Sequence, residues 1–211
     1  MKFNPDCTRC PRLAAHLEQV RDDYPEYHAR PVAPFGAKNP QLLIVGLAPG
    51  MHGANASGRP FTGDYAGILL YDTLHRFGFS NRPESTTRDD GLQLRNCRIT
   101  NAVKCLPPGN KPLTEEIKNC NPYLRSELGR LQSPVVILAL GKIAHDAVLR
   151  ALDHKLSRFP FGHGHTYEVE PGTWLLDSYH CSRYNTQTRR LTAEMFRNIF
   201  SKVHKILNIN N

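Results

Sequence analysis

The sequence predicts an α/β fold built on a parallel sheet with helices on both faces. Short apolar runs of strand length, such as residues 42–45 and 135–140, alternate along the chain with segments whose apolar residues recur at helical spacing. These runs are apolar throughout, which is typical of strands buried on both faces. At 211 residues the chain is long enough for one α/β domain with a sizeable core, although length alone leaves room for two small ones.

The remaining elements complete this alternation. One helix is expected to use Thr114 as its N-cap, with Glu115 and Glu116 in the first turn, where the helix dipole favours acidic side chains. The polar residues 80–92 are expected to form a solvated loop. In chain order, the expected helices cover residues 13–22, 68–77, 114–131, 142–152 and 192–207, and the further strands cover residues 98–103, 166–169 and 173–177.

The loop that follows the first strand, residues 46–67, is far richer in glycine than ordinary packing requires. Its glycines and prolines separate a chemically diverse set of side chains: His52, Asn55, Arg59, Phe61 and Asp64. A surface loop made of turn residues is the alternative. Long loops in compact domains are usually functional, and α/β proteins bind ligands beyond the carboxyl ends of strands, so we expect a binding loop.

Each of the four best strand candidates ends in an unusual cluster. The glycine-rich loop follows Val45, a proline-containing loop follows Asn101, Gly141 ends the third strand, and a basic loop begins at His180. Because the carboxyl ends of parallel strands meet at one edge of a sheet, we expect these clusters to form one site.

The chain is basic, with 27 Lys and Arg against 19 Asp and Glu and a formal net charge of +8. This balance favours a polyanionic partner, nucleic acid before membrane, over the alternative of a generically basic surface. The N-terminus lacks the apolar segment of a signal peptide, and no apolar run reaches transmembrane length. We therefore expect a soluble intracellular protein with no membrane partner.

Six cysteines in such a chain indicate metal binding or catalysis rather than disulfides. Cys7 and Cys10 form a C-x-x-C pair, and Cys105 and Cys120 can complete a set of four thiolates. Four thiolates suit either tetrahedral zinc or a [4Fe–4S] cluster, and spacing does not choose between them. Cys97 lies in an apolar run and is expected to be a core residue.

Three segments resemble the family 5 (UDGb-type) uracil-DNA glycosylases. The first is Gly46-Leu-Ala-Pro-Gly-x-His-Gly-Ala-Asn55 with Gly58-Arg-x-Phe-Thr-Gly-Asp64, the second is Asn101-Ala-Val-Lys-Cys-x-Pro-Pro-x-Asn-x-Pro112, and the third begins at His180-x-Ser182. Family 4 enzymes are similar but typically carry an acidic residue where Leu47 stands, which makes family 5 the better match. The resemblance runs nearly the whole length of the chain.

This resemblance implies a three-layer α/β/α sandwich around a central four-stranded parallel sheet, in a single domain over residues 1–211. It also implies a monomeric protein of the prokaryotic cytoplasm, associated with the nucleoid. Its [4Fe–4S] cluster would be structural, held by Cys7, Cys10, Cys105 and Cys120. The third motif is commonly His-Pro-Ser, whereas here Cys181 replaces the proline. We interpret Cys181 as a small packing residue rather than a nucleophile.

Excising a base from DNA requires flipping the nucleotide, stabilising the leaving base and placing a water at the sugar. We assign the last task, or charge stabilisation of the sugar cation, to Asp64, although an Asp here can also cap the following helix. His180 can donate to a base carbonyl oxygen, and Asn101 can read a base edge with a donor and an acceptor. The alternatives are an ordinary surface histidine and a strand-end cap.

Further residues are expected to contact the base or the DNA. Phe61 would stack on the flipped base, since it lies outside any apolar stripe of the core. Singly, each arginine after His180 could be a solvated charge; together they favour phosphate binding, with an aromatic wedge among them. The other expected base contacts are Gly46, Ala48, Pro49, Asn55 and His52, and the expected DNA contacts are Arg183, Tyr184, Arg189 and Arg190.

The sequence thus predicts a monofunctional DNA glycosylase of base excision repair, acting on uracil and on other deaminated bases such as hypoxanthine or xanthine. One alternative is a catalytically silent nucleic-acid-binding module with a structural [4Fe–4S] cluster, which would not need Asp64. An iron–sulfur or zinc electron carrier would not explain the glycine-rich loop. A lyase is disfavoured because Lys104 and Lys142 only flank the expected site.

Overall fold

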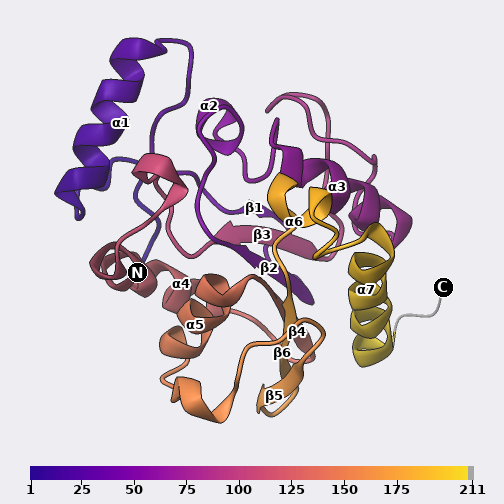
Figure 1. Cartoon of the computed structure of the whole chain (residues 1–211). Helices are drawn as coiled ribbons and strands as arrows, with labels where there is room; N and C mark the ends of the chain where they lie inside the picture. Colours follow the sequence, from indigo (N-terminus) through magenta and orange to yellow (C-terminus); the bar gives the residue numbers. More distant parts are fainter. Residues whose placement is uncertain (209–211) are drawn as a thin grey trace.

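A six-stranded sheet with helices on both faces organises the computed structural model, which describes residues 1–208 (Figure 1). Its four central strands are parallel, and the two edge strands run antiparallel to their neighbours. The predicted four-stranded parallel sheet is thus confirmed as the centre of a wider one. In sheet order the strands are β1 (Phe35–Gly36), β3 (Cys97–Asn101), β2 (Leu42–Gly46), β4 (Val135–Leu140), β6 (Thr173–Ser178) and β5 (Thr166–Glu170).

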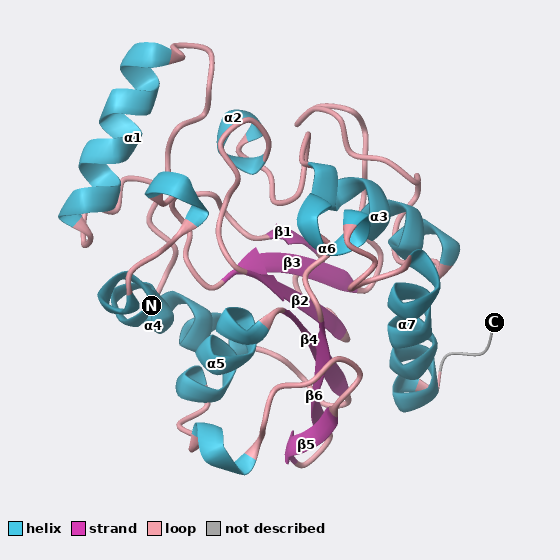
Figure 2. Cartoon of the chain, in the orientation of Figure 1, coloured by secondary structure: helices cyan, strands magenta, loops and turns pink. Residues whose placement is uncertain are grey.

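The helices lie on both sides of the sheet, which confirms the three-layer arrangement (Figure 2). Because side chains alternate across a strand, Leu42 and Ile44 pack with α3 and α7, whereas Leu43 and Val45 pack with α4 and α5. No helix within residues 1–208 has both the length and the apolar character needed to cross a bilayer. The helices are α1 (Pro11–Asp23), α2 (Ala54–Ser57), α3 (Tyr65–Arg76), α4 (Thr114–Leu128), α5 (Lys142–Ala151), α6 (Arg183–Gln187) and α7 (Ala193–Leu207).

Two local expectations were wrong or incomplete. Leu113, not Thr114, is the N-cap of α4, because the Glu116 carboxylate accepts the Leu113 backbone N–H at 2.7 Å and supplies the cap from inside the helix. The short helices α2 and α6 lie within segments expected to be loops. Helices of one turn bury too few residues to produce an apolar period in the sequence.

The central strands end together at one edge of the sheet. Gly46 is paired with Asn101 at the ends of β2 and β3, and Leu140 with Ser178 at the ends of β4 and β6. The pairing of β2 and β3 continues past the strands, since the Ala102 N–H donates to the Gly46 carbonyl at 2.9 Å. The segments that follow β2 and β3 therefore run side by side beyond the carboxyl ends of the strands.

Candidate active site

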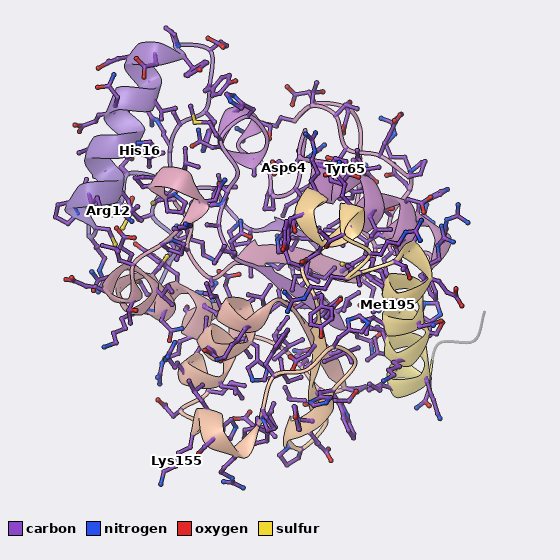
Figure 3. All side chains as sticks on the ribbon, viewed as in Figure 1. Arg12, His16, Asp64, Tyr65, Lys155 and Met195 are labelled. Carbon is purple, nitrogen blue, oxygen red and sulfur yellow. The ribbon has the colours of Figure 1, made fainter. Side chains whose placement is uncertain are left out.

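A pocket of about 430 Å³ lies beyond the carboxyl ends of the central strands. Segments that follow β2, β3 and β6 line it, so three of the four predicted clusters meet there, while Gly141 after β4 packs behind His180. Figure 3 shows Asp64 and Tyr65 next to each other near α2 and α6. The polar and aromatic lining residues are Phe61, Asp64, Tyr65, Asn101, Asn110, His180, Ser182 and Arg183.

Asp64 occupies the N-cap position of α3 but makes no side-chain bond to that helix. Its Oδ2 atom instead accepts the backbone N–H of Ala54, at the start of α2, at 3.1 Å. A Cβ at Gly53 would lie 1.9 Å from Asp64 Oδ1, so only glycine permits this close approach. Burial raises the pKa of Asp64 and the bond from Ala54 opposes that rise, as in a carboxylate suited to proton transfer.

Phe61 forms one wall of the pocket in a backbone conformation that is rare for a bulky residue, with φ of +56°. The preceding carbonyl, of Pro60, accepts the buried Tyr71 hydroxyl at 2.7 Å. The Phe61 ring stacks beside the His180 ring, with centroids 5.9 Å apart and planes at 27°. Such outliers persist where surrounding contacts determine them, and they occur often at ligand sites.

Arg59 holds this turn in place and was not assigned a role from the sequence. Its buried guanidinium donates to Thr62 Oγ1 at 2.7 Å and, across the loop of residues 80–92, to Asp90 Oδ2 at 2.6 Å. Burial acts to raise the pKa of Asp90, but bonds from Arg59 and from backbone N–H groups lower it to about 2. No sequence spacing links these two residues, and the loop expected to be solvated is partly ordered by them.

Asn101 ends β3 with its side chain almost fully buried at the pocket wall. Its Oδ1 atom has no hydrogen-bond partner among residues 1–208. A Cβ at Gly46 would lie 2.4 Å from that oxygen and 2.8 Å from Phe61 Cζ, so Gly46 lets both side chains approach the strand end. Buried amides are normally paired, and an unpaired one in a pocket wall is suited to a ligand.

His180 lies in the pocket as a neutral imidazole, because burial lowers its pKa to about 4. The backbone around it is braced: Asn185 Nδ2 donates to the His180 carbonyl at 2.8 Å, and Ser182 caps α6. Cys181 is fully buried in the core, as expected for a packing residue, and burial raises the pKa of its thiol to about 12. A thiol of this kind is protonated and unreactive at neutral pH.

Of the other expected base contacts, some line the pocket and some do not. Ala48 lines the pocket, whereas Pro49 and Asn55 are buried outside the lining, and neither polar atom of the Asn55 side chain has a partner among residues 1–208. His52 is exposed outside the pocket, where its Nδ1 atom lies 2.9 Å from the Tyr27 hydroxyl. The apolar lining residues Leu47 and Ala54 were not singled out from the sequence.

The basic residues after His180 are exposed. The Arg183 guanidinium lies 4.9 Å from the ring centre of Tyr65, and both residues line the pocket. Arg190 stacks on the Tyr179 ring at 4.6 Å, and the Tyr184 side chain is 70% exposed. Arg189 is also exposed. Of these basic residues only Arg183 belongs to the pocket lining, so it is the one that brings positive charge to the pocket itself.

The structure also brings together Cys7, Cys10, Cys105 and Cys120, which line one small cavity of about 20 Å³. Burial raises the pKa values of the last three, and the neighbouring thiols raise them further. Within residues 1–208 no three His, Cys, Asp or Glu side chains are arranged to hold a single metal ion. Four of the residues around this cavity offer sulfur atoms as ligands, which is the number and kind of donor that a [4Fe–4S] cluster uses.

Comparisons with known proteins agree with this geometry. The model of the uracil DNA glycosylase superfamily matches residues 33–204. A type-5 uracil-DNA glycosylase of Thermus thermophilus is 46% identical over 207 residues, covering 95% of this chain and 93% of that protein. One of Pyrobaculum aerophilum is 42% identical, covering 90% and 84%, and a type-4 enzyme of the same organism is 35% identical, covering 68% and 65%. The chain therefore belongs to the uracil-DNA glycosylase superfamily and, within it, to the type-5 uracil-DNA glycosylases.

Proposed function

We propose that this protein is a monofunctional DNA glycosylase that excises uracil, and also hypoxanthine and xanthine, by hydrolysing the N-glycosidic bond. One observation carries the proposal: a carboxylate, a neutral imidazole and an unpaired amide meet in a pocket walled by an aromatic ring. The names of the relatives support uracil as a substrate. The pocket's volume supports the larger bases, because it leaves room for a bicyclic ring.

Each group has a task in this reaction. The flipped base stacks on Phe61, and Asn101 binds its edge with a donor and an acceptor. Neutral His180 donates a hydrogen bond to a base carbonyl oxygen, where negative charge develops as the glycosidic bond breaks. Ionised Asp64 orients the water that attacks C1′, or stabilises the cationic sugar by charge. Burial raises the pKa of Asp64, which makes its carboxylate a stronger base than an exposed aspartate.

Contacts with DNA are proposed to come from Arg183, Arg189 and Arg190, which would bind phosphates next to the flipped nucleotide. The exposed ring of Tyr184 would enter the space that this nucleotide leaves. The formal charge of +8 supports binding to a polyanion. We propose that the protein acts as a monomer on nucleoid DNA in the cytoplasm.

The test of this function uses duplexes that carry uracil, hypoxanthine or xanthine opposite each normal base. We expect abasic sites with each lesion, revealed as strand breaks only after alkali, because neither nearby lysine is available for a Schiff base. Lys104 is buried and fully hydrogen-bonded, and Lys142 pairs with Asp146 at 2.7 Å. Binding of the duplexes without any abasic product would instead identify the catalytically silent module.

The pH dependence should reflect Asp64 and His180, the two titratable groups of the pocket whose pKa values burial shifts. Asp64 must be ionised, so the rate should fall as the pH drops through its raised pKa. His180 has a pKa of about 4 and stays neutral above it, so His180 should contribute no change in rate near pH 6.5, where an ordinary histidine titrates. The measurement is the single-turnover rate on a uracil duplex across pH. A limb near pH 6.5 that disappears in His180→Gln would contradict this assignment.

We further propose that Cys7, Cys10, Cys105 and Cys120 hold a [4Fe–4S] cluster in the same domain as the pocket. The four sulfur donors that line the cavity support this, as does the backbone N–H of Lys104, which donates to Cys120 Sγ at 3.3 Å. Such a cluster would be structural, since it joins the N-terminal segment to α4 and the loop after β3. It would supply no chemistry to the excised base.

Loss of the cluster is expected when one of these thiols is removed. Protein purified without oxygen should contain iron and acid-labile sulfide in equal amounts and absorb visible light. Cys120→Ser should lose both signals and melt at a lower temperature, whereas the matched change Cys97→Ser, in the opposite core, should keep them. Zinc in place of iron and sulfide in the purified protein would overturn the assignment.

A further inference from the structure

Lys104 places a positive charge in the interior of the protein, with 1% of its side chain exposed. An ammonium group has three N–H donors, and each has an acceptor here. Lys104 Nζ donates to Thr100 Oγ1, to the Asn101 carbonyl at 2.9 Å and to Glu127 Oε1 at 2.7 Å. The side chain therefore joins the end of β3 to the last turn of α4.

The backbone of the same residue contacts the cysteine cavity. Its N–H donates to Cys120 Sγ, and its carbonyl accepts the Val32 N–H at 2.7 Å. The next residue along the chain, Cys105, also lines that cavity. Lys104 thus contacts the cysteine cavity with its backbone and the pocket residue Asn101 with its side chain.

Stability does not explain this buried ion pair. Burying two charges costs desolvation energy, and an apolar pair of similar size is often equally stable. Glu127 Oε2 also lacks a partner among residues 1–208 although it is buried, so the pair is incompletely satisfied. What the lysine does provide is a fixed bond to the peptide of Asn101. The N–H of the same peptide group, which belongs to Ala102, donates to the Gly46 carbonyl, so this peptide next to the base-reading side chain is held at both its C=O and its N–H.

We propose that Lys104 is a positioning residue that fixes Asn101 for base recognition and links it to the four-cysteine cavity. Because Nζ binds the carbonyl rather than the amide of Asn101, it leaves the side-chain donor and acceptor free for the base. A change at the cysteines is transmitted to the pocket through one residue, by way of its backbone N–H and its side chain. The catalytic part of this proposal rests on the proposed glycosylase function.

The test separates positioning from stability with the double variant Lys104→Met/Glu127→Leu, which removes both charges and keeps apolar bulk. We expect a melting temperature near that of the wild type and unchanged iron and sulfide content. The kcat for uracil excision should fall roughly 10- to 100-fold with little change in KM, as expected for a misplaced recognition group. A matched control is Arg125→Gln/Asp153→Asn, which removes an exposed ion pair between α4 and the turn after α5 and should retain kcat.

A second readout is independent of catalysis. The side-chain amide of Asn101 should give one sharp pair of ¹H–¹⁵N signals in the wild type, identified by their loss in Asn101→Asp. In the double variant these signals should broaden or split, because the peptide of Asn101 has lost its bond. Wild-type kcat together with unchanged Asn101 signals would overturn the proposal. If the wild type excises no uracil, the proposed function fails, while the amide signals still decide the role of Lys104.

Discussion

Asp64→Asn is expected to fold, to bind uracil-containing DNA and to lose most of its turnover. Asparagine has the size of aspartate and keeps an oxygen for the Ala54 N–H, so the packing against Gly53 is preserved. It cannot accept a proton or carry the negative charge that the sugar cation requires. Positioned acid–base groups contribute roughly 10²- to 10⁴-fold to rate, and we expect a loss in that range. The measurement is the single-turnover rate at saturating enzyme.

Asp72→Asn is the matched control, since Asp72 lies on the same helix and its bonds are to Arg76 and Arg197 rather than to the loop above β2. This variant should excise uracil at close to the wild-type rate. If Asp64→Asn retained full activity, the water or the sugar cation would have to be served by another group. The assignment of Asp64 would then be wrong even if the protein remained a glycosylase.

Gly46→Ala is expected to lower the excision rate roughly 100-fold, because one added methyl group displaces two recognition groups together. Its Cβ would lie 2.4 Å from Asn101 Oδ1 and 2.8 Å from Phe61 Cζ, both closer than real contacts allow. A misplacement of about 1 Å at a reacting site can cost this much. Both groups project into the pocket, so they have space to move without unfolding the sheet. The measurement combines the single-turnover rate with the melting temperature.

Gly129→Ala provides the comparison for this substitution. Gly129 follows α4 in a right-handed helical conformation, and a Cβ there would meet only the Arg125 carbonyl at 3.4 Å. Its activity and melting temperature should stay close to the wild-type values. Equal activity of Gly46→Ala and the wild type would show that Asn101 and Phe61 do not need their present positions.

The layers and the central strands could be predicted because the apolar runs of the strands and the helical spacing of apolar residues are both local features of the sequence. An apolar run such as residues 135–140 identifies a buried strand by itself, and β4 has those bounds. Alternation with helices then places the strand ends at one edge. Strand β1 could not be found, since it consists of two residues that pair with β3 across more than sixty positions of sequence.

The site was predictable where motif residues lie at the end of a strand or just after it, as Asn101 and His180 do. It was less predictable inside the glycine-rich loop, where backbone turns decide which side chains face inward. His52 and Asp64 both belong to that loop, yet the first faces solvent and the second faces the pocket. The role of Arg59 was also not predictable, because its partners lie at residues 85–90 and come close to Arg59 only when the chain folds.

The contacts of Arg59 determine which residues of the loop at 85–90 can change during evolution. Two of its acceptors, at Thr87 and Arg88, are main-chain carbonyls, which every residue type offers. Within this loop, only Ser85 and Asp90 bind Arg59 through their side chains, so only these two positions need a particular residue type. Substitutions between these two positions should therefore be tolerated as long as the loop keeps its length. The surface beside the pocket can change its charge and shape during evolution without disturbing the turn that carries Phe61.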